Sequence, residues 1–213
     1  MKTGAGLERI LRAAPVVPVL TVEDWKAAVP LARALVAGGL PAIEITLRTP
    51  AALEAIRAVA AEVEGAFVGA GTVLTADQFS QAAAAKASFV VSPGASSALV
   101  QAAEESDVPF LPGAATATEA MTLLDYGFAI QKFFPAGPAG GSAYLKALAP
   151  PLPGVRFCPT GGVDAKNAAE YLALSNVICV GGSWVAPKEA IAAGDWSRIE
   201  ALARKAAGLG KTS

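Results

Sequence analysis

Hydrophobic residues fall into two alternating patterns along the chain. Short apolar runs typical of buried parallel strands alternate with longer segments in which Ala, Leu and Glu recur at helical spacing. The predicted strands are residues 16–20, 42–47, 66–73, 88–92, 109–112, 128–134, 155–160 and 177–181. The predicted helices that follow them are residues 24–37, 50–63, 76–85, 96–105, 118–124, 142–149, 165–172 and 196–207.

Eight strands alternating with eight helices predict an α/β protein, a (β/α)8 TIM barrel that forms a single domain over residues 1–213. The segment before the first strand, MKTGAGLERILRA, predicts an extra N-terminal helix that closes the bottom of the barrel. It lacks the apolar core of a signal peptide. An open doubly wound sheet is the alternative, although no GxGxxG motif follows the first strand.

Composition disfavours several classes of function. The net charge is -1 and 16% of residues are charged, so no basic surface for nucleic acid is expected. No apolar run reaches the ~18–20 residues that cross a membrane. Two cysteines without CxxC spacing, Cys158 and Cys179, suggest a cytoplasmic protein in which both thiols are buried core residues.

The chain contains no histidine. This excludes Ser-His-Asp and Cys-His catalysis, and with them zinc sites that use histidine ligands. A metal-dependent aldolase, which typically needs several histidine ligands, is disfavoured, and no metal or cofactor is expected. The remaining candidate chemistry includes a lysine nucleophile.

A single lysine stands in the apolar strand that runs from Phe128 to Phe134. Burial disfavours the ammonium form, and the neutral amine of Lys132 could attack a carbonyl carbon and form a Schiff base. The alternative is a lysine at the end of a strand whose amine reaches water. On the second strand, alternation places Glu44, Thr46 and Arg48 on one face. Glu44 could carry protons and Arg48 could bind a carboxylate. The alternative is a structural ion pair between Glu44 and Arg48.

Glycine-rich turns follow several strands, and barrels place their chemistry at these strand ends. Thr72, after Gly69-Ala70-Gly71, is either a ligand-binding residue or a helix cap. The Thr160-Gly161-Gly162 and Gly181-Gly182-Ser183 turns end the last two strands, where barrels often hold phosphate on bare amides. Together with Lys132, these residues suit a 2-oxo acid that carries a distal phosphate.

Several motifs together resemble one known family, the 2-keto-3-deoxy-6-phosphogluconate (KDPG) aldolases. The similarity covers nearly the whole chain. It is carried by Glu44–Thr49, Gly69–Thr72, Val91–Gly94, Lys132–Ala136, Phe157–Gly162 and Gly181–Trp184. The resemblance implies a class I aldolase, usually a homotrimer, that cleaves 2-dehydro-3-deoxy-6-phosphogluconate into pyruvate and glyceraldehyde 3-phosphate in the Entner–Doudoroff pathway. Many members also split 4-hydroxy-2-oxoglutarate (KHG) into pyruvate and glyoxylate.

The resemblance also implies roles for individual residues. Lys132 would form the Schiff base, and Glu44 would be the acid/base acting through a water. The other implied binding residues are Arg48, Thr72 and Pro93 around the carboxylate, Phe134 against the pyruvyl unit, Thr160 and Ser183 near the aldehyde, and Gly161, Gly162, Gly182 and Ser183 at the phosphate. Two positions depart from the family pattern: Gly137 replaces a frequent glutamate, and Lys86 replaces a helix-ending glycine.

Other functions stay open at this point. The substrate could be the galactonate epimer, or mainly 4-hydroxy-2-oxoglutarate. A phosphate-binding barrel isomerase or synthase would keep the Gly-Gly turns without needing Lys132. A non-enzymatic trimeric assembly scaffold would fit the uncharged, alanine-rich helices.

Overall fold

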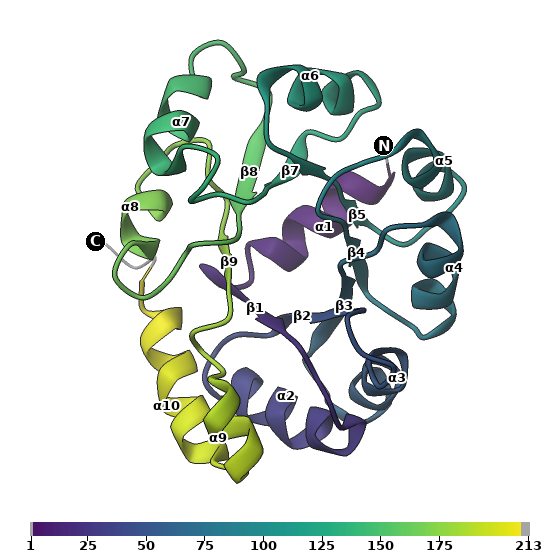
Figure 1. Ribbon diagram of the computed structural model, residues 1–213, viewed down its shortest axis with the longest axis vertical. Helices are drawn as coiled ribbons and strands as arrows, with labels where there is room; N and C mark the ends of the chain where they lie inside the picture. Colours follow the sequence, from purple (N-terminus) through teal and green to yellow (C-terminus); the bar gives the residue numbers. More distant parts are fainter. Residues whose placement is uncertain (1, 210–213) are drawn as a thin grey trace.

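The strands of the computed structural model, which describes residues 2–209, are all parallel and form two hydrogen-bonded sets (Figure 1). One is a six-stranded sheet in the order β5-β4-β3-β2-β1-β9, and the other is a three-stranded sheet in the order β6-β7-β8. The strands are β1 Val16–Leu20, β2 Ala42–Thr46, β3 Phe67–Gly71, β4 Phe89–Val91, β5 Phe110–Leu111, β6 Gly113–Ala114, β7 Ile130–Phe133, β8 Arg156–Pro159 and β9 Val180–Gly182.

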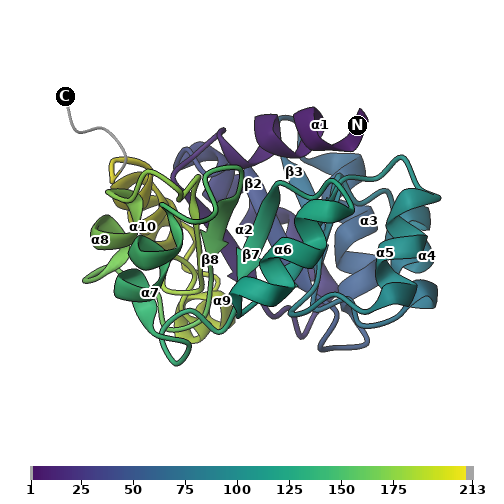
Figure 2. The ribbon, with the colours of Figure 1, turned by 90° about the horizontal axis from the view of Figure 1, so that it is seen from above.

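The helices other than α1 lie outside the strands, and α1 lies across one end of them (Figures 1 and 2). The helices of the described chain are α1 Lys2–Leu11, the 3-10 turn η1 Trp25–Ala27, α2 Ala28–Ala37, α3 Ala52–Glu62, α4 Ala76–Ala84, α5 Ser97–Glu104, α6 Ala117–Asp125, α7 Gly141–Leu148, α8 Ala168–Leu172, α9 Lys188–Ala193 and α10 Trp196–Ala207. Among residues 2–209, four of the α-helices start at a side-chain cap, supplied by Thr75, Ser96, Thr116 and Asp195. Helix α9 was not predicted.

Strand order tests the open doubly wound sheet that the sequence left as an alternative. In the six-stranded sheet the order follows the chain, and the last strand, β9, lies beside β1. A doubly wound sheet reverses its order, so that alternative is wrong. The predicted fifth strand, residues 109–112, is observed as β5, and a further short strand, β6, follows after Pro112, which has no N–H to donate. Single bridges, Phe157–Val177 and Thr160–Gly181, join β8 to the β9 segment. The predicted α/β fold with a parallel sheet is confirmed, and that sheet is curled.

The curled strands surround an apolar cluster on their inner face, and α1 covers this cluster at the N-terminal ends of the strands (Figure 2). Alternate strand residues point into it because side chains alternate across a strand. Three buried residues of α1 pack against this interior, which confirms the predicted N-terminal helix. The residues of this cluster are Leu7, Ile10, Leu11, Val17, Ala42, Phe89, Val91, Leu111, Ile130, Cys158 and Cys179. Across residues 2–209, no helix has the length and apolar character needed to cross a membrane.

Lys86 stands at the position that follows the C-cap of α4, where the chain turns into the left-handed region. Its φ is 65°, its N–H donates to the Ala83 carbonyl at 3.0 Å, and the Ala87 N–H donates to the Ala82 carbonyl at 3.1 Å. Glycine is the usual residue in this motif because a β-carbon is strained there. The position is therefore the glycine position that the family resemblance implied.

Replacing Lys86 with glycine is expected to raise the free energy of unfolding by about 0.5–1 kcal/mol, because the left-handed strain of a β-carbon disappears. Urea denaturation measures this change. Lys86→Ala is the matched control, since it removes the charged stem and keeps the β-carbon. An equal gain in Lys86→Ala would show that conformation is not the cause.

Candidate active site

Lys132 and Glu44 face each other inside the sheet. Lys132 Nζ donates to Glu44 Oε1 at 3.2 Å, and each side chain is only 4% exposed. Lys132 is on β7, in register with Gly113 of β6 and Cys158 of β8, while Glu44 is on β2. The lysine therefore does not reach water, and the carboxylate pairs with it. The ion pair that the sequence alternative expected, Glu44–Arg48, is not formed.

This arrangement also corrects the expected surroundings of the amine. The sequence predicted a neutral amine in an apolar pocket, but Lys132 Nζ has a carboxylate on one side and the Phe134 ring centroid at 5.3 Å on another. A buried charged pair is costly unless its groups are well matched or used. A carboxylate at hydrogen-bond distance is able to take a proton from the amine, which nucleophilic attack requires.

Glycines allow close packing around this pair. A β-carbon at Gly71 of β3 would overlap the Glu44 carboxylate, and one at Gly113 would overlap the backbone of Pro93. Gly71 is the second glycine of the predicted Gly-x-Gly turn. One reason for glycine at this position of the motif is that the Glu44 side chain occupies the space of a β-carbon. The close approach at Gly113 brings Pro93, at the end of β4, beside the strand that neighbours Lys132.

Thr72 follows Gly71 and has a φ of 57°. A β-branched residue in the left-handed region is rare, because its side chain clashes with the backbone there. Strained backbone of this kind concentrates at functional sites. Thr72 caps no helix, since the α4 cap is Thr75. The capping alternative is therefore wrong, and a ligand-binding role for Thr72 stays a prediction.

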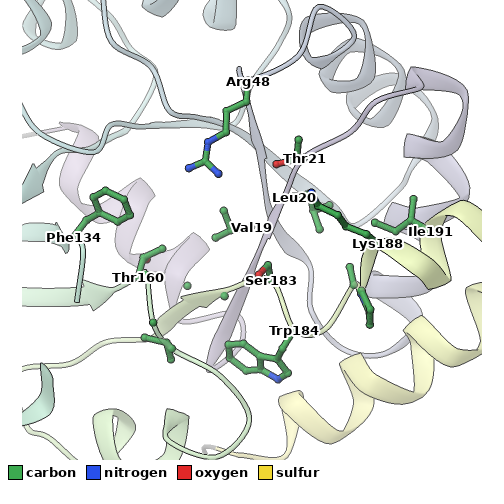
Figure 3. A pocket seen from close by; sticks show the side chains of 17 residues that line it. Val19, Leu20, Thr21, Arg48, Phe134, Thr160, Ser183, Trp184, Lys188 and Ile191 are labelled. Carbon is green, nitrogen blue, oxygen red and sulfur yellow. The ribbon is translucent and has the colours of Figure 1, made fainter. Parts of the chain in front are cut away.

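A cleft of about 630 Å³ lies over the strand ends that follow β1, β2, β7, β8 and β9. It is lined by seven of the predicted binding residues, and Figure 3 shows several of them around it. These seven are Arg48, Phe134, Thr160, Gly161, Gly162, Gly182 and Ser183. Lys132, Glu44, Thr72 and Pro93 do not line it. The Phe134 ring, which lines the cleft and lies near Lys132 Nζ, joins the cleft to the buried pair.

The two Gly-Gly turns have conformations and contacts that other residues would not tolerate. Gly161 and Gly162 have φ values of 89° and 79°. The Asn167 side-chain amide donates to the Gly162 carbonyl at 2.9 Å and fixes this turn. A β-carbon at Gly182 would overlap the Trp184 ring. Both turns therefore present bare backbone at the cleft, as the sequence predicted.

Comparison with known proteins agrees with this geometry. The family model described as KDPG and KHG aldolase matches residues 7–202. The chain belongs to the KDPG and KHG aldolase family. This membership confirms the predicted resemblance and the predicted class of enzyme, an aldolase, which is a carbon–carbon lyase.

Similar proteins match this aldolase chain over most of their length. A 2-dehydro-3-deoxy-phosphogluconate aldolase of Dickeya dadantii is 51% identical over 205 residues, which are 96% of this chain and 95% of the relative. A KDPG aldolase structure from Legionella pneumophila, with pyruvate captured as a covalent carbinolamine, has a TM-score of 0.92 at 44% identity and covers 94% of this chain and 97% of its own. A Zymomonas mobilis KDPG aldolase with 3-phosphoglycerate has a TM-score of 0.90 at 47% identity and covers 95% of each chain.

Sequence reasoning missed several residues that line the cleft of this aldolase. Thr21 follows the first strand, whose end was not read for chemistry, and its hydroxyl lies 3.3 Å from that of Thr46. Trp184 was recognised only as part of a motif. Lys188 lies on α9, the unpredicted helix. Their position in the sequence could have identified them, because each follows the C-terminal end of a strand, where the other site residues lie.

The two cysteines are buried free thiols, as predicted. Cys179 Sγ donates to Cys158 Sγ at 3.5 Å. This hydrogen bond, with burial, raises the pKa of the Cys179 thiol well above its usual value, so the thiol stays neutral. Among residues 2–209, no group of three or more His, Cys, Asp or Glu side chains is placed to hold a metal ion.

Proposed function

We propose that the protein is a class I aldolase that cleaves 2-dehydro-3-deoxy-6-phosphogluconate into pyruvate and glyceraldehyde 3-phosphate. One observation carries this proposal: a buried amine, Lys132 Nζ, lies 3.2 Å from a carboxylate, Glu44 Oε1. A lysine that is held out of water beside a proton acceptor suits Schiff-base chemistry. Cleavage of 4-hydroxy-2-oxoglutarate is proposed as a second activity, because the matched family includes KHG aldolases.

In the proposed reaction Lys132 Nζ attacks the 2-oxo carbon of the substrate, and Glu44 takes the proton that the amine loses. Loss of water from the carbinolamine gives a protonated Schiff base, which draws electrons from the bond between C3 and C4. Removal of the proton from the C4 hydroxyl then breaks that bond, releases the aldehyde and leaves an enamine. Protonation of the enamine carbon and hydrolysis release pyruvate and regenerate the amine.

The remaining residues are proposed to position the substrate. The Arg48 guanidinium binds the substrate carboxylate through two parallel hydrogen bonds, and Thr72 and Pro93 lie around that carboxylate. Phe134 packs against the pyruvyl unit. Thr160 and Ser183 orient the aldehyde half. The backbone amides of Gly161, Gly162, Gly182 and Ser183 bind the phosphate, at the turns after the last two strands, where phosphate sites are frequent in barrels.

The proposal extends to architecture and assembly. The single bridges from β8 to the β9 segment, and the one-residue break between β5 and β6, support a closed (β/α)8 barrel that forms one domain over residues 1–213. Family resemblance supports a homotrimer, and sedimentation velocity tests it. The unjoined thiols of Cys158 and Cys179, 3.5 Å apart, support a reducing, cytoplasmic location.

Pyruvate release, coupled to lactate dehydrogenase, tests the substrate. We expect the highest kcat/KM with 2-dehydro-3-deoxy-6-phosphogluconate, and a lower value with 4-hydroxy-2-oxoglutarate. The galactonate epimer is the decisive competitor, because it differs only in the orientation of one hydroxyl. Faster cleavage of that epimer would make the protein a 2-dehydro-3-deoxy-6-phosphogalactonate aldolase, and pyruvate release from none of the three would refute the proposal.

A further inference from the structure

The side chains that line the cleft carry an unbalanced charge. Of its 17 lining residues, all within the described part of the chain, Arg48 and Lys188 are cationic and none is acidic. The whole chain has a net charge of -1, so this local excess does not follow from composition. A cleft with two cations and no carboxylate suits a ligand that carries two separate anionic groups.

The two cations enter the cleft from different elements. Arg48 follows β2, whereas Lys188 is the first residue of α9. In Figure 3 the Lys188 side chain runs from α9 toward Leu20 and Thr21, and Ser183 lies between it and Thr160. Because Phe134 marks the side nearest Lys132, the Lys188 amine lies toward the end where the non-reacting part of a substrate would extend.

The Lys188 ammonium has no protein counter-ion among the described residues. The adjacent carboxylate, Glu189 Oε1, accepts from Arg198 Nη2 at 3.0 Å. That ion pair keeps the nearest acidic side chain in sequence engaged with α10. An exposed, uncompensated ammonium at the rim of a cleft is available to a ligand anion.

We propose that Lys188 is a specificity residue that selects substrates with a phosphate at the end far from the 2-oxo group. This inference rests on the proposed aldolase function and adds a residue that the glycine turns do not provide. Backbone amides of the Gly161-Gly162 and Gly182-Ser183 turns hydrogen-bond to an oxygen, but only a full positive charge responds strongly to the two negative charges of a phosphate. Because Lys188 is exposed, solvent screening keeps the effect modest.

The variant Lys188→Gln tests this assignment, with pyruvate release measured from 2-dehydro-3-deoxy-6-phosphogluconate and from unphosphorylated 2-dehydro-3-deoxygluconate. We expect KM for the phosphorylated substrate to rise about two- to fivefold, kcat to stay within about twofold, and kcat/KM for the unphosphorylated substrate not to change. Lys188→Arg keeps the charge and should restore KM. Higher salt should weaken the wild-type preference more than that of Lys188→Gln.

Lys205→Gln is the matched control, since Lys205 is an exposed lysine on α10 that does not line the cleft. An equal loss with both substrates, or the same loss in Lys205→Gln, would overturn the specificity role. Calorimetric titration with glycerol 3-phosphate gives a reading that needs no catalysis: its Kd should rise about two- to fivefold in Lys188→Gln. An unchanged Kd would overturn the role of Lys188 alone. Failure of the wild type to release pyruvate would instead overturn the proposed function.

Discussion

Lys132→Ala is expected to lose cleavage activity by about 10⁴-fold or more, because it removes the only group proposed to bond covalently to the substrate. Borohydride reduction in the presence of pyruvate should trap an adduct on Lys132 in the wild type, and peptide mass spectrometry should find none in the variant. Unchanged cleavage in Lys132→Ala would refute the Schiff-base assignment.

A second variant separates chemistry from folding. Lys132→Ala leaves the Glu44 carboxylate buried without its partner, which by itself is expected to cost about 3–5 kcal/mol of stability. Lys132→Arg keeps a cation beside Glu44, and a guanidinium stays protonated and does not form a Schiff base. A folded, inactive Lys132→Arg protein that traps no pyruvate would therefore assign the loss to the nucleophile.

Glu44→Gln is expected to slow exchange of the pyruvate methyl protons with solvent by about 10²–10⁴-fold, while the borohydride adduct still forms at a lower rate because water replaces Glu44 as the acceptor of the amine proton. The reason is that the amide keeps the shape of the side chain but cannot carry the proton between enamine carbon and solvent. Proton NMR in heavy water measures the exchange. Normal exchange in this variant would remove Glu44 from the acid/base role.

Thr46→Ser is the matched control for that experiment. Thr46 shares the strand with Glu44, and its hydroxyl donates to the Leu20 carbonyl at 2.8 Å, so it ties β2 to β1. Serine keeps that hydroxyl and leaves the carboxylate in place. Slowed exchange in Thr46→Ser would show that strand position, and not the Glu44 proton, limits the reaction.

The fold was largely predictable because buried parallel strands are continuous apolar runs and the intervening helices repeat on one apolar face. The errors have physical causes. Pro112 lacks an N–H and ends the predicted run of residues 109–112, so the two-residue strand β6 that follows it was not predicted. Helix α9 is six residues long, too short for a periodic pattern to distinguish it from a loop.

The site was predictable as a set of strand ends, but not as a set of contacts. Glu44 and Lys132 are 88 positions apart, and only the curling of the sheet brings them to 3.2 Å. Local alternation instead suggested a pair between Glu44 and Arg48, four residues apart, because sequence spacing reports neighbours on one strand and not partners across the interior. Lys188 was missed because it lies on α9, which was not predicted.

Helix α1 covers the N-terminal ends of the strands, and the cleft opens at the opposite ends. Substrate and products of the proposed reaction therefore enter and leave through the same opening of the cleft. The fragment attached to Lys132 sits deepest, with the aldehyde between it and the exit. Product release is therefore expected to be ordered, with the aldehyde released first and pyruvate second. Glyceraldehyde 3-phosphate that stays bound in the cleft should slow turnover.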